Sequence, residues 1–176
     1  MKRFVRFRNC LLVMILSSLC GGAASFAAEQ AAEHAVRAAL LVNFMKFSEW
    51  PAGAFPDEKL RVCVASGDVD QKLALQSIEG RQVRRVRIEV LAYQAGADCD
   101  LLYVDSRQRW KAIHEQLRGR HVLTVGGYDG FLEDAGMIEI ALLPAGPRFD
   151  VSLTESRRAG VRFNPQFLRL ARRVVD

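Results

Sequence analysis

The sequence has 176 residues, half of them hydrophobic, with 25 Lys and Arg against 20 Asp and Glu and a formal net charge of +5. Four basic residues and no acidic residue lie in the first 27 positions, which leaves 21 basic and 20 acidic residues, a net charge of +1, in the remainder. This balance gives no support to nucleic-acid binding, and the remaining length suits one domain with a sizeable core.

Residues 1–27 have the layout of a secretory signal peptide. Basic side chains between Lys2 and Arg8 precede the apolar run at 11–16, and small residues follow around Ala27. The apolar run is too short to span a bilayer comfortably. We therefore expect export of the chain and cleavage after Ala27.

Two cysteines remain after this cut, Cys63 and Cys99. An even cysteine count in an exported chain favours a disulfide, which in the chain-entropy model would contribute about 3 to 4 kcal/mol for a loop of this size. The Cys-x-x-Cys spacing that is typical of redox-active pairs does not occur. The sequence thus predicts a structural bridge.

The first predicted element is an amphipathic helix over residues 29–50, ended by Pro51. At 100° per residue, Asn43 falls in the same sector as Phe44, Phe47 and Trp50. The pattern therefore predicts that Asn43 is buried. An unpaired buried amide is costly, so we expect Asn43 to bond the backbone of an adjacent strand or loop.

The next elements are a short strand at 60–65, a helix at 69–78 and a strand at 84–92. In the last of these, Val86, Ile88 and Val90 alternate with charged residues, which predicts one wet face.

Two nearly continuous apolar runs, at 99–104 and 121–125, are separated by a predicted helix at 107–118. Two buried strands joined by a helix indicate a βαβ unit with parallel pairing.

The last part of the chain predicts a hairpin and a helix. Residues 137–142 and 148–153 both alternate, which indicates antiparallel strands. Asn164 and Pro165 are typical of a helix start, and an apolar stripe extends that helix to Val175. The predicted fold is a single α/β domain, a mixed sheet flanked by helices.

No residue pattern points to an enzyme, a metal or a cofactor. The glycines at 126–130 lack the P-loop lysine and the dinucleotide spacing, so they are interpreted as turn residues with positive φ. His34, His114 and His121 show no metal-binding spacing, and Ser106 has neither a nucleophile elbow nor an evident base.

Taken together, several segments resemble the YfiR-like family of periplasmic proteins. They are LLVNFMKFSEWP at 40–51, the spaced cysteines, HVLTVGGYDGF with the following AGMIEI, and RFDVSLTESRRAGVRFNPQFLRLA. The residues that match the family signature are Asn43, Phe44, Phe47, Trp50, Pro51, Gly126, Gly130, Phe131 and Gly136. The chain departs from the pattern at Ala135, where family members tend to have glycine, and at Val151 and Ser152, where they tend to have an asparagine.

The resemblance implies regulation without chemistry. Such a protein would bind and inhibit the periplasmic sensor domain of an inner-membrane diguanylate cyclase of the YfiN type. A YfiB-like outer-membrane lipoprotein would sequester the inhibitor away from the cyclase. Inhibition of the cyclase would lower the cytoplasmic level of cyclic di-GMP and reduce biofilm formation. A homodimer is possible, and no nucleic acid or cofactor is implied.

An alternative hypothesis is that the protein is a periplasmic small-molecule sensor that signals to a histidine kinase or another receptor, because similar domains are fused to such kinases. Asp105 and Ser106 end a buried strand, a position that lines ligand crevices in α/β proteins. With Gly126 and Gly127 they form the predicted ligand crevice.

Overall fold

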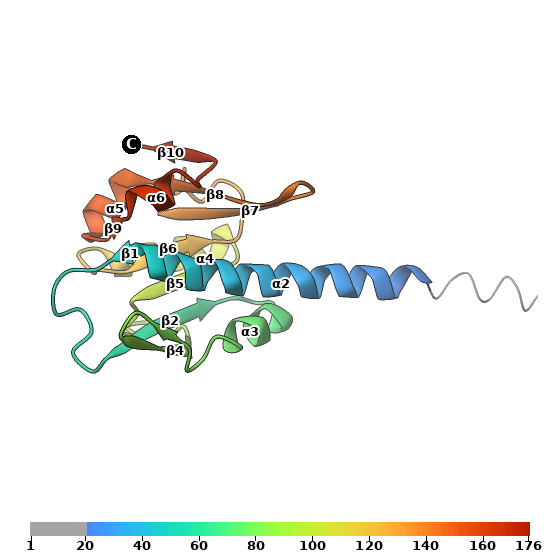
Figure 1. The fold of residues 1–176 in the computed structure, drawn as a ribbon, viewed down its shortest axis with the longest axis horizontal. Coiled ribbons are helices and arrows are strands. Elements are labelled where there is room, and N and C mark those ends of the chain that lie inside the picture. The colour runs from blue at the N-terminus through green and yellow to red at the C-terminus, as the bar shows by residue number, and fades with distance from the viewer. Residues whose placement is uncertain (1–20) are drawn as a thin grey trace, which may run out of the picture. The chain divides into compact units, whose positions relative to one another are not determined.

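The computed structural model describes residues 21–176, with side chains described from residue 27 onward. It divides into an N-terminal unit that ends at Glu33 and a larger unit, His34–Asp176, and each is considered by itself. Helix α2 (Gly21–Phe47) runs through both units (Figure 1). Most of the predicted signal segment, residues 1–27, lies outside the described residues.

The larger unit is built on an eight-stranded mixed sheet (Figure 1). Its strands are β2 (Lys59–Ala65), β3 (Gln82–Val83), β4 (Val86–Ala92), β5 (Leu101–Val104), β6 (Leu123–Gly126), β7 (Ile138–Leu143), β8 (Gly146–Ser152) and β10 (Arg173–Val175). Their order is β10-β8-β7-β6-β5-β2-β4-β3. The five strands from β7 to β4 are mutually parallel, whereas β3 and β8 pair antiparallel with their neighbours and β10 runs parallel to β8.

Short helices and a small ribbon complete the fold. The helices are α3 (Val69–Gln76), α4 (Arg107–Ile113) with the 3-10 turn η1 (His114–Leu117), α5 (Leu153–Ala159) and α6 (Pro165–Leu168). Strands β1 (Ser48–Glu49) and β9 (Arg162–Phe163) pair as a two-stranded antiparallel ribbon. The predicted mixed α/β fold is confirmed.

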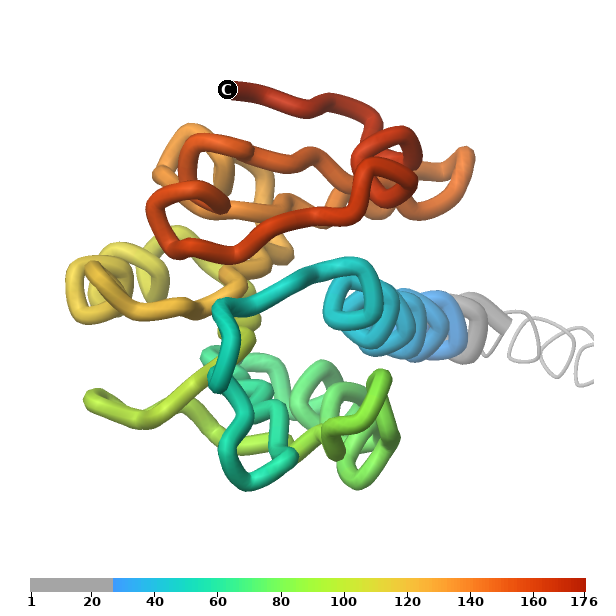
Figure 2. The backbone as a smooth tube through the Cα atoms, turned by 60° about the vertical axis from the view of Figure 1, so that its left-hand side comes forward, coloured from blue at the N-terminus to red at the C-terminus, as the bar shows by residue number. Residues whose placement is uncertain are grey.

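The sheet is covered on both faces, which explains the continuous apolar run in β5. Leu101 and Tyr103 belong to the larger core cluster, with α2, whereas Leu102 and Val104 belong to a second cluster with α4. Figure 2 shows α2 in blue on one side of the central strands and residues 107–120 in yellow on the other.

The predicted strand pairings are confirmed. Leu101 of β5 pairs with Leu123 of β6 in the parallel register that a βαβ unit requires. Ile140 pairs with Phe149 in the antiparallel hairpin of β7 and β8. In β4, Ile88 and Val90 are buried while Arg87 is exposed.

The prediction for Asn43 is wrong, because its side chain is exposed. The helix ends at Phe47, so Trp50, which served to define the apolar sector, is not part of it. The buried stripe instead contains Leu41, Met45 and, just beyond the helix, Ser48, whose hydroxyl donates to the Phe44 carbonyl at 2.8 Å. A buried Asn43 amide therefore does not set the register of this helix.

The prediction of one long C-terminal helix is also wrong. Helix α6 is a single turn, capped by Asn164 as expected, and the chain then returns as β10 beside β8. The cause lies in Asp150, which is fully buried on β8. Its carboxylate accepts hydrogen bonds from Arg172 at 2.9 and 2.7 Å and from Arg173 at 3.1 Å.

Helix α5 was not predicted, although its capping residues are present in the sequence. The Ser152 side chain accepts a hydrogen bond from the Glu155 N–H, and Gly160 ends the helix at a φ of +69°. These are the start and stop signals of a short helix.

Replacing Asp150 tests the attachment of β10. The Arg172 hydrogen bonds lower the pKa of Asp150, so its stabilising contribution is present above the unfolded pKa of about 3.9 and is lost as the pH falls through the lower folded value. Asp150→Asn should lower the free energy of unfolding at neutral pH by about 2 kcal/mol and reduce its acid dependence. Urea unfolding at several pH values measures both effects.

The matched control is Asp176→Asn, because Asp176 also pairs with an arginine, Arg157, but both side chains are mostly exposed. This change should cost less than about 0.5 kcal/mol. Equal losses in the two variants would contradict the role given to Asp150.

Candidate functional site

The strand order creates a reversal of winding between β2 and β5. From β2 the chain winds through α3 to β4 on one side, and it then crosses back to place β5 and β6 on the other. Crevices form beyond the carboxyl ends of parallel strands at such a point, and ligands of α/β proteins bind there. A crevice of about 320 Å³ occupies this position, lined by His34, Arg37, Asp68, Gln71, Tyr103, Asp105, Ser106, Arg109 and Gly127.

Asp105 ties the ends of β2 and β5 together. Its Oδ2 accepts hydrogen bonds from the Ser66 hydroxyl at 2.8 Å and the Gly67 N–H at 2.6 Å, both just after β2. Its Oδ1 lies 3.1 Å from Nε of Arg109. Burial raises the pKa of Asp105, but the hydrogen bonds and Arg109 together outweigh it and hold the pKa below its usual value. Asp105 is thus a carboxylate whose oxygens are already engaged.

Helices α2 and α3 supply a second polar group. Gln71 on α3 is buried, and its side-chain oxygen accepts from Arg37 at 3.4 Å and lies 3.0 Å from Nδ1 of His34. Asp68 caps α3 by accepting from the Gln71 N–H at 3.0 Å, and its other oxygen lies 3.5 Å from Nε2 of His34. These contacts link the start of α3 to α2.

Tyr103 contributes its hydroxyl from the end of β5. Burial raises the pKa of Tyr103 to about 12, so the phenol is neutral at physiological pH. A Cβ on Gly127 would overlap this hydroxyl. The close approach of Tyr103 therefore favours glycine at position 127. A positive φ is not the reason, because Gly127 does not have one.

Three of the four residues predicted to form a ligand crevice line this one. Asp105, Ser106 and Gly127 do so, whereas Gly126 belongs to a packing unit on the other face of the sheet. The other six lining residues were not predicted: His34, Arg37, Asp68, Gln71, Tyr103 and Arg109. A usable signal was the placement of His34 and Arg37, which precede Leu41 at helical spacing on the buried side of α2.

The glycine-rich loop is a packing device around Phe131. A Cβ on Gly126 or on Gly136 would overlap the fully buried Phe131 ring. Only Gly130 of the predicted turn glycines has a positive φ, +85°, so the prediction is wrong for Gly126 and Gly127. The buried Glu139 carboxylate accepts from the N–H groups of Gly130 and Leu132 at 3.1 and 3.3 Å, which holds the loop in place.

The aromatic signature residues of the first segment pack into the core. Phe44 makes an edge contact with Phe149, with centroids 5.1 Å apart, and Phe47 stacks on Phe167 at 6.0 Å. Trp50 donates its indole N–H to the Asp100 carbonyl at 3.1 Å. These contacts are structural.

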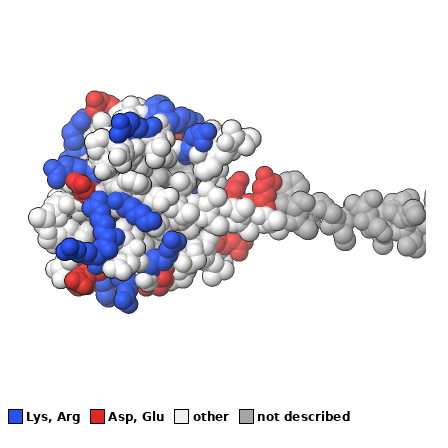
Figure 3. Space-filling view, in the orientation of Figure 1, with Lys and Arg blue, Asp and Glu red and all other residues white. Residues whose placement is uncertain are grey.

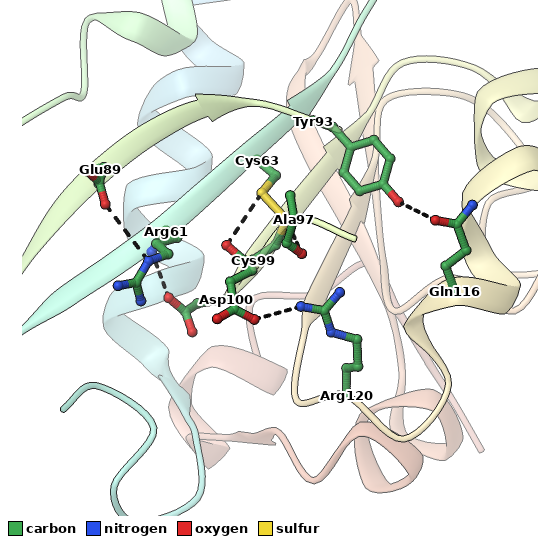
Figure 4. The surroundings of a disulfide bond; sticks show 10 residues. Arg61, Cys63, Glu89, Tyr93, Ala97, Cys99, Asp100, Gln116 and Arg120 are labelled. Carbon is green, nitrogen blue, oxygen red and sulfur yellow. Dashed lines mark hydrogen bonds and ion pairs between the residues drawn. A yellow bond between two sulfur atoms is a disulfide. The ribbon is translucent and has the colours of Figure 1, made fainter. Parts of the chain in front are cut away.

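Cys63 and Cys99, the two cysteines predicted to pair, form a disulfide on the α4 face of the sheet (Figure 4). Both are buried. Beside the bridge, the Asp100 carboxylate accepts from the Arg61 N–H at 2.7 Å, and Arg120 pairs with Asp98 at 2.8 Å. The bridge and these contacts fix the start of β5 against β2.

The surface charges are mixed. On the face shown in Figure 3, Lys and Arg side chains lie among Asp and Glu side chains. Several are paired, as in Lys59 with Glu89 at 3.2 Å. Within residues 21–176, no group of three His, Cys, Asp or Glu side chains is placed to hold a metal ion. The described helices include none with the length and apolar character needed to cross a membrane.

The sheet of the larger unit belongs to the doubly wound α/β class, and a polar crevice lies at its switch point. The model of the YfiR/HmsC-like family matches residues 34–172, and the chain belongs to this family. Proteins of this family are regulatory proteins of the periplasm and are not known as enzymes.

Two solved structures are similar to this chain at low sequence identity. A conserved domain protein from Vibrio cholerae is 10% identical with a TM-score of 0.43, over 69% of this chain and 56% of that one. The ABC domain from Streptococcus pneumonia, solved in complex with L-Trp, is 11% identical with a TM-score of 0.50, over 76% and 60%. This chain therefore spans less than two thirds of either protein. A comparison with curated proteins gave no match.

Ala135 offers a direct test of the loop conformation. It is exposed and adopts a φ of +65°, a left-handed conformation that costs an L-residue about 1–2 kcal/mol. Ala135→Gly should therefore raise the free energy of unfolding by about 1 kcal/mol, measured by urea denaturation. The matched control is Ala112→Gly on an exposed position of α4, which should lower stability by about 1 kcal/mol. A loss in both variants would contradict the assigned conformation.

The packing of Phe131 predicts a second effect. Gly126→Ala should destabilise the fold by about 3 kcal/mol, because the added methyl group meets a ring with no room to move. Combined with Phe131→Ala, the loss should be smaller than the sum of the two single losses by at least about 1 kcal/mol. Additive losses in this double-mutant cycle would show that the ring and the glycine are not in contact.

Proposed function

We propose that this protein is a periplasmic repressor that binds the periplasmic sensor domain of an inner-membrane diguanylate cyclase. Its binding keeps the cyclase inactive and lowers cytoplasmic cyclic di-GMP and biofilm formation. The observation that carries the proposal is the YfiR/HmsC-like family match over residues 34–172, because this family suggests regulation of cyclic di-GMP signalling from the periplasm.

Repression of this kind is a population shift. The protein must bind the inactive cyclase more tightly than the active one, because equal affinity for both states would change nothing. A YfiB-like outer-membrane lipoprotein would relieve the repression by competing for the same protein. The disulfide between Cys63 and Cys99 supports this role by fixing β2 and β5 in the exported state.

Deletion of the gene in the native bacterium tests the proposal. Cytoplasmic cyclic di-GMP should rise, and the intact gene should reverse the rise. The variant Cys63→Ala with Cys99→Ala should restore repression poorly, because loss of the bridge costs about 3 kcal/mol of stability. Cyclic di-GMP in cell extracts and the amount of periplasmic protein are measured together.

An unchanged cyclic di-GMP level after deletion would contradict the repressor function. Ala112→Gly serves as the matched control, since it lowers stability while leaving the disulfide in place. If it abolished repression to the same extent, a loss of about 1 kcal/mol would suffice, and the larger effect expected from losing the disulfide would be contradicted.

A second candidate function is a small-molecule sensor that feeds a membrane receptor such as a histidine kinase. The observation in its favour is the polar crevice at the switch point, which includes Asp105, Ser106 and Gly127. The two functions are compatible, because a ligand of the crevice would be a natural input to a repressor.

A further inference from the structure

Gln71 carries a buried donor that no contact among the described residues explains. The residue is only 2% exposed, and its amide nitrogen has no hydrogen-bond partner among the described residues. Its oxygen is held by Arg37 and faces His34. Buried amide groups in native structures are nearly always paired, so an unpaired one in a crevice indicates a missing acceptor.

The two carboxylates of the crevice already face donors or cations. Asp105 receives hydrogen bonds from Ser66 and Gly67 and is paired with Arg109. Asp68 caps α3 through one oxygen and lies beside His34 with the other. Further donors remain, since Arg109 uses its Nε on Asp105, has two terminal amino groups as well, and has a side chain that is 46% exposed. The crevice therefore offers donors to an incoming acceptor.

The charge and size of the crevice restrict that acceptor. Two arginines, Arg37 and Arg109, face two carboxylates, Asp68 and Asp105, so the lining is close to neutral apart from His34. A multiply charged phosphate would meet both carboxylates at short range, which disfavours it. The volume of about 320 Å³ lies at the small end of ligand pockets. A carboxylate carries two oxygens side by side, and these can accept hydrogen bonds from an amide N–H₂ group and from a guanidinium group.

We infer that this crevice binds a small organic molecule through a single carboxylate group, held by Gln71 and Arg109. The inference deepens the sensor function proposed above for the same crevice. It does not depend on inhibition of a cyclase.

Binding would also act on α2. The Gln71 amide nitrogen has no contact with solvent, and the oxygen of the same amide group contacts Arg37 and His34 of α2. A ligand oxygen reaches the buried nitrogen only when the Gln71 amide or a side chain next to it moves, and a moved amide changes the contacts with Arg37 and His34. The ligand therefore favours a different arrangement of α2 side chains, and this gives a regulatory protein a local conformational response.

The test is a thermal-shift titration of the exported chain, residues 28–176, with acetate, L-lactate, glycine and inorganic phosphate as probes. At least one carboxylate should raise Tm saturably by about 3 °C or more, whereas phosphate at matched ionic strength should not. Gln71→Glu replaces the amide donor by a carboxylate, which repels the carboxylate of the probe, so the rise in Tm should be abolished. Arg109→Gln, at a position 46% exposed, should weaken the apparent affinity at least tenfold while keeping the fold.

Lys72→Gln is the matched control, because Lys72 is the exposed neighbour of Gln71 on α3 and does not line the crevice. It should leave the shift unchanged. Three results would overturn the inference: no probe stabilises the protein, phosphate alone does, or Arg109→Gln leaves the carboxylate shift intact. A carboxylate shift that requires Gln71 and Arg109, found together with unchanged cyclic di-GMP on deletion, would support this inference and remove the repressor function.

Discussion

The contacts of Asp105 at the end of β5 are the constraint around which the candidate site is arranged. At the switch point the connections from β2 and β5 leave toward opposite faces of the sheet, so no helix joins the two strand ends directly. The Asp105 carboxylate joins them instead, through Ser66 and Gly67. The same carboxylate positions Arg109 at the mouth of the crevice. One half-buried carboxylate thus joins the ends of two central strands and pairs with an arginine that lines the crevice.

The two faces of the sheet have different roles around this point. The α4 face contains the disulfide and the Phe131 packing unit, which fix the strands and the glycine-rich loop. The α2 face contains the larger core and, at its end, the polar contacts of Gln71. The packed strands thus lie beneath a small group of polar side chains, which the binding proposed for the crevice requires. Membership of a family of regulatory proteins agrees with this arrangement.

The sequence predicts the fold well where local patterns and tertiary packing agree. The alternation in β4 and the apolar runs of β5 and β6 directly reflect one-sided and two-sided burial. The prediction fails where a residue far away in the sequence determines the conformation of a segment. Asp150 extends the last segment as β10, and Phe131 demands glycine at two positions that look like turn residues. The crevice was predicted in part, because Asp105 follows a buried strand, but Gln71 and Arg109 have no local signal.

The central claim is that recognition takes place at the switch point, with Gln71 as the buried donor. Nuclear magnetic resonance of the ¹⁵N-labelled exported chain tests it most directly, because the Gln71 side-chain amide gives its own signals. On titration with the carboxylate probe that stabilises the protein, these signals and the backbone signals of Gly67 and Asp68 should shift most. Shifts concentrated elsewhere, such as around Trp50, or an unchanged Gln71 amide would contradict the account.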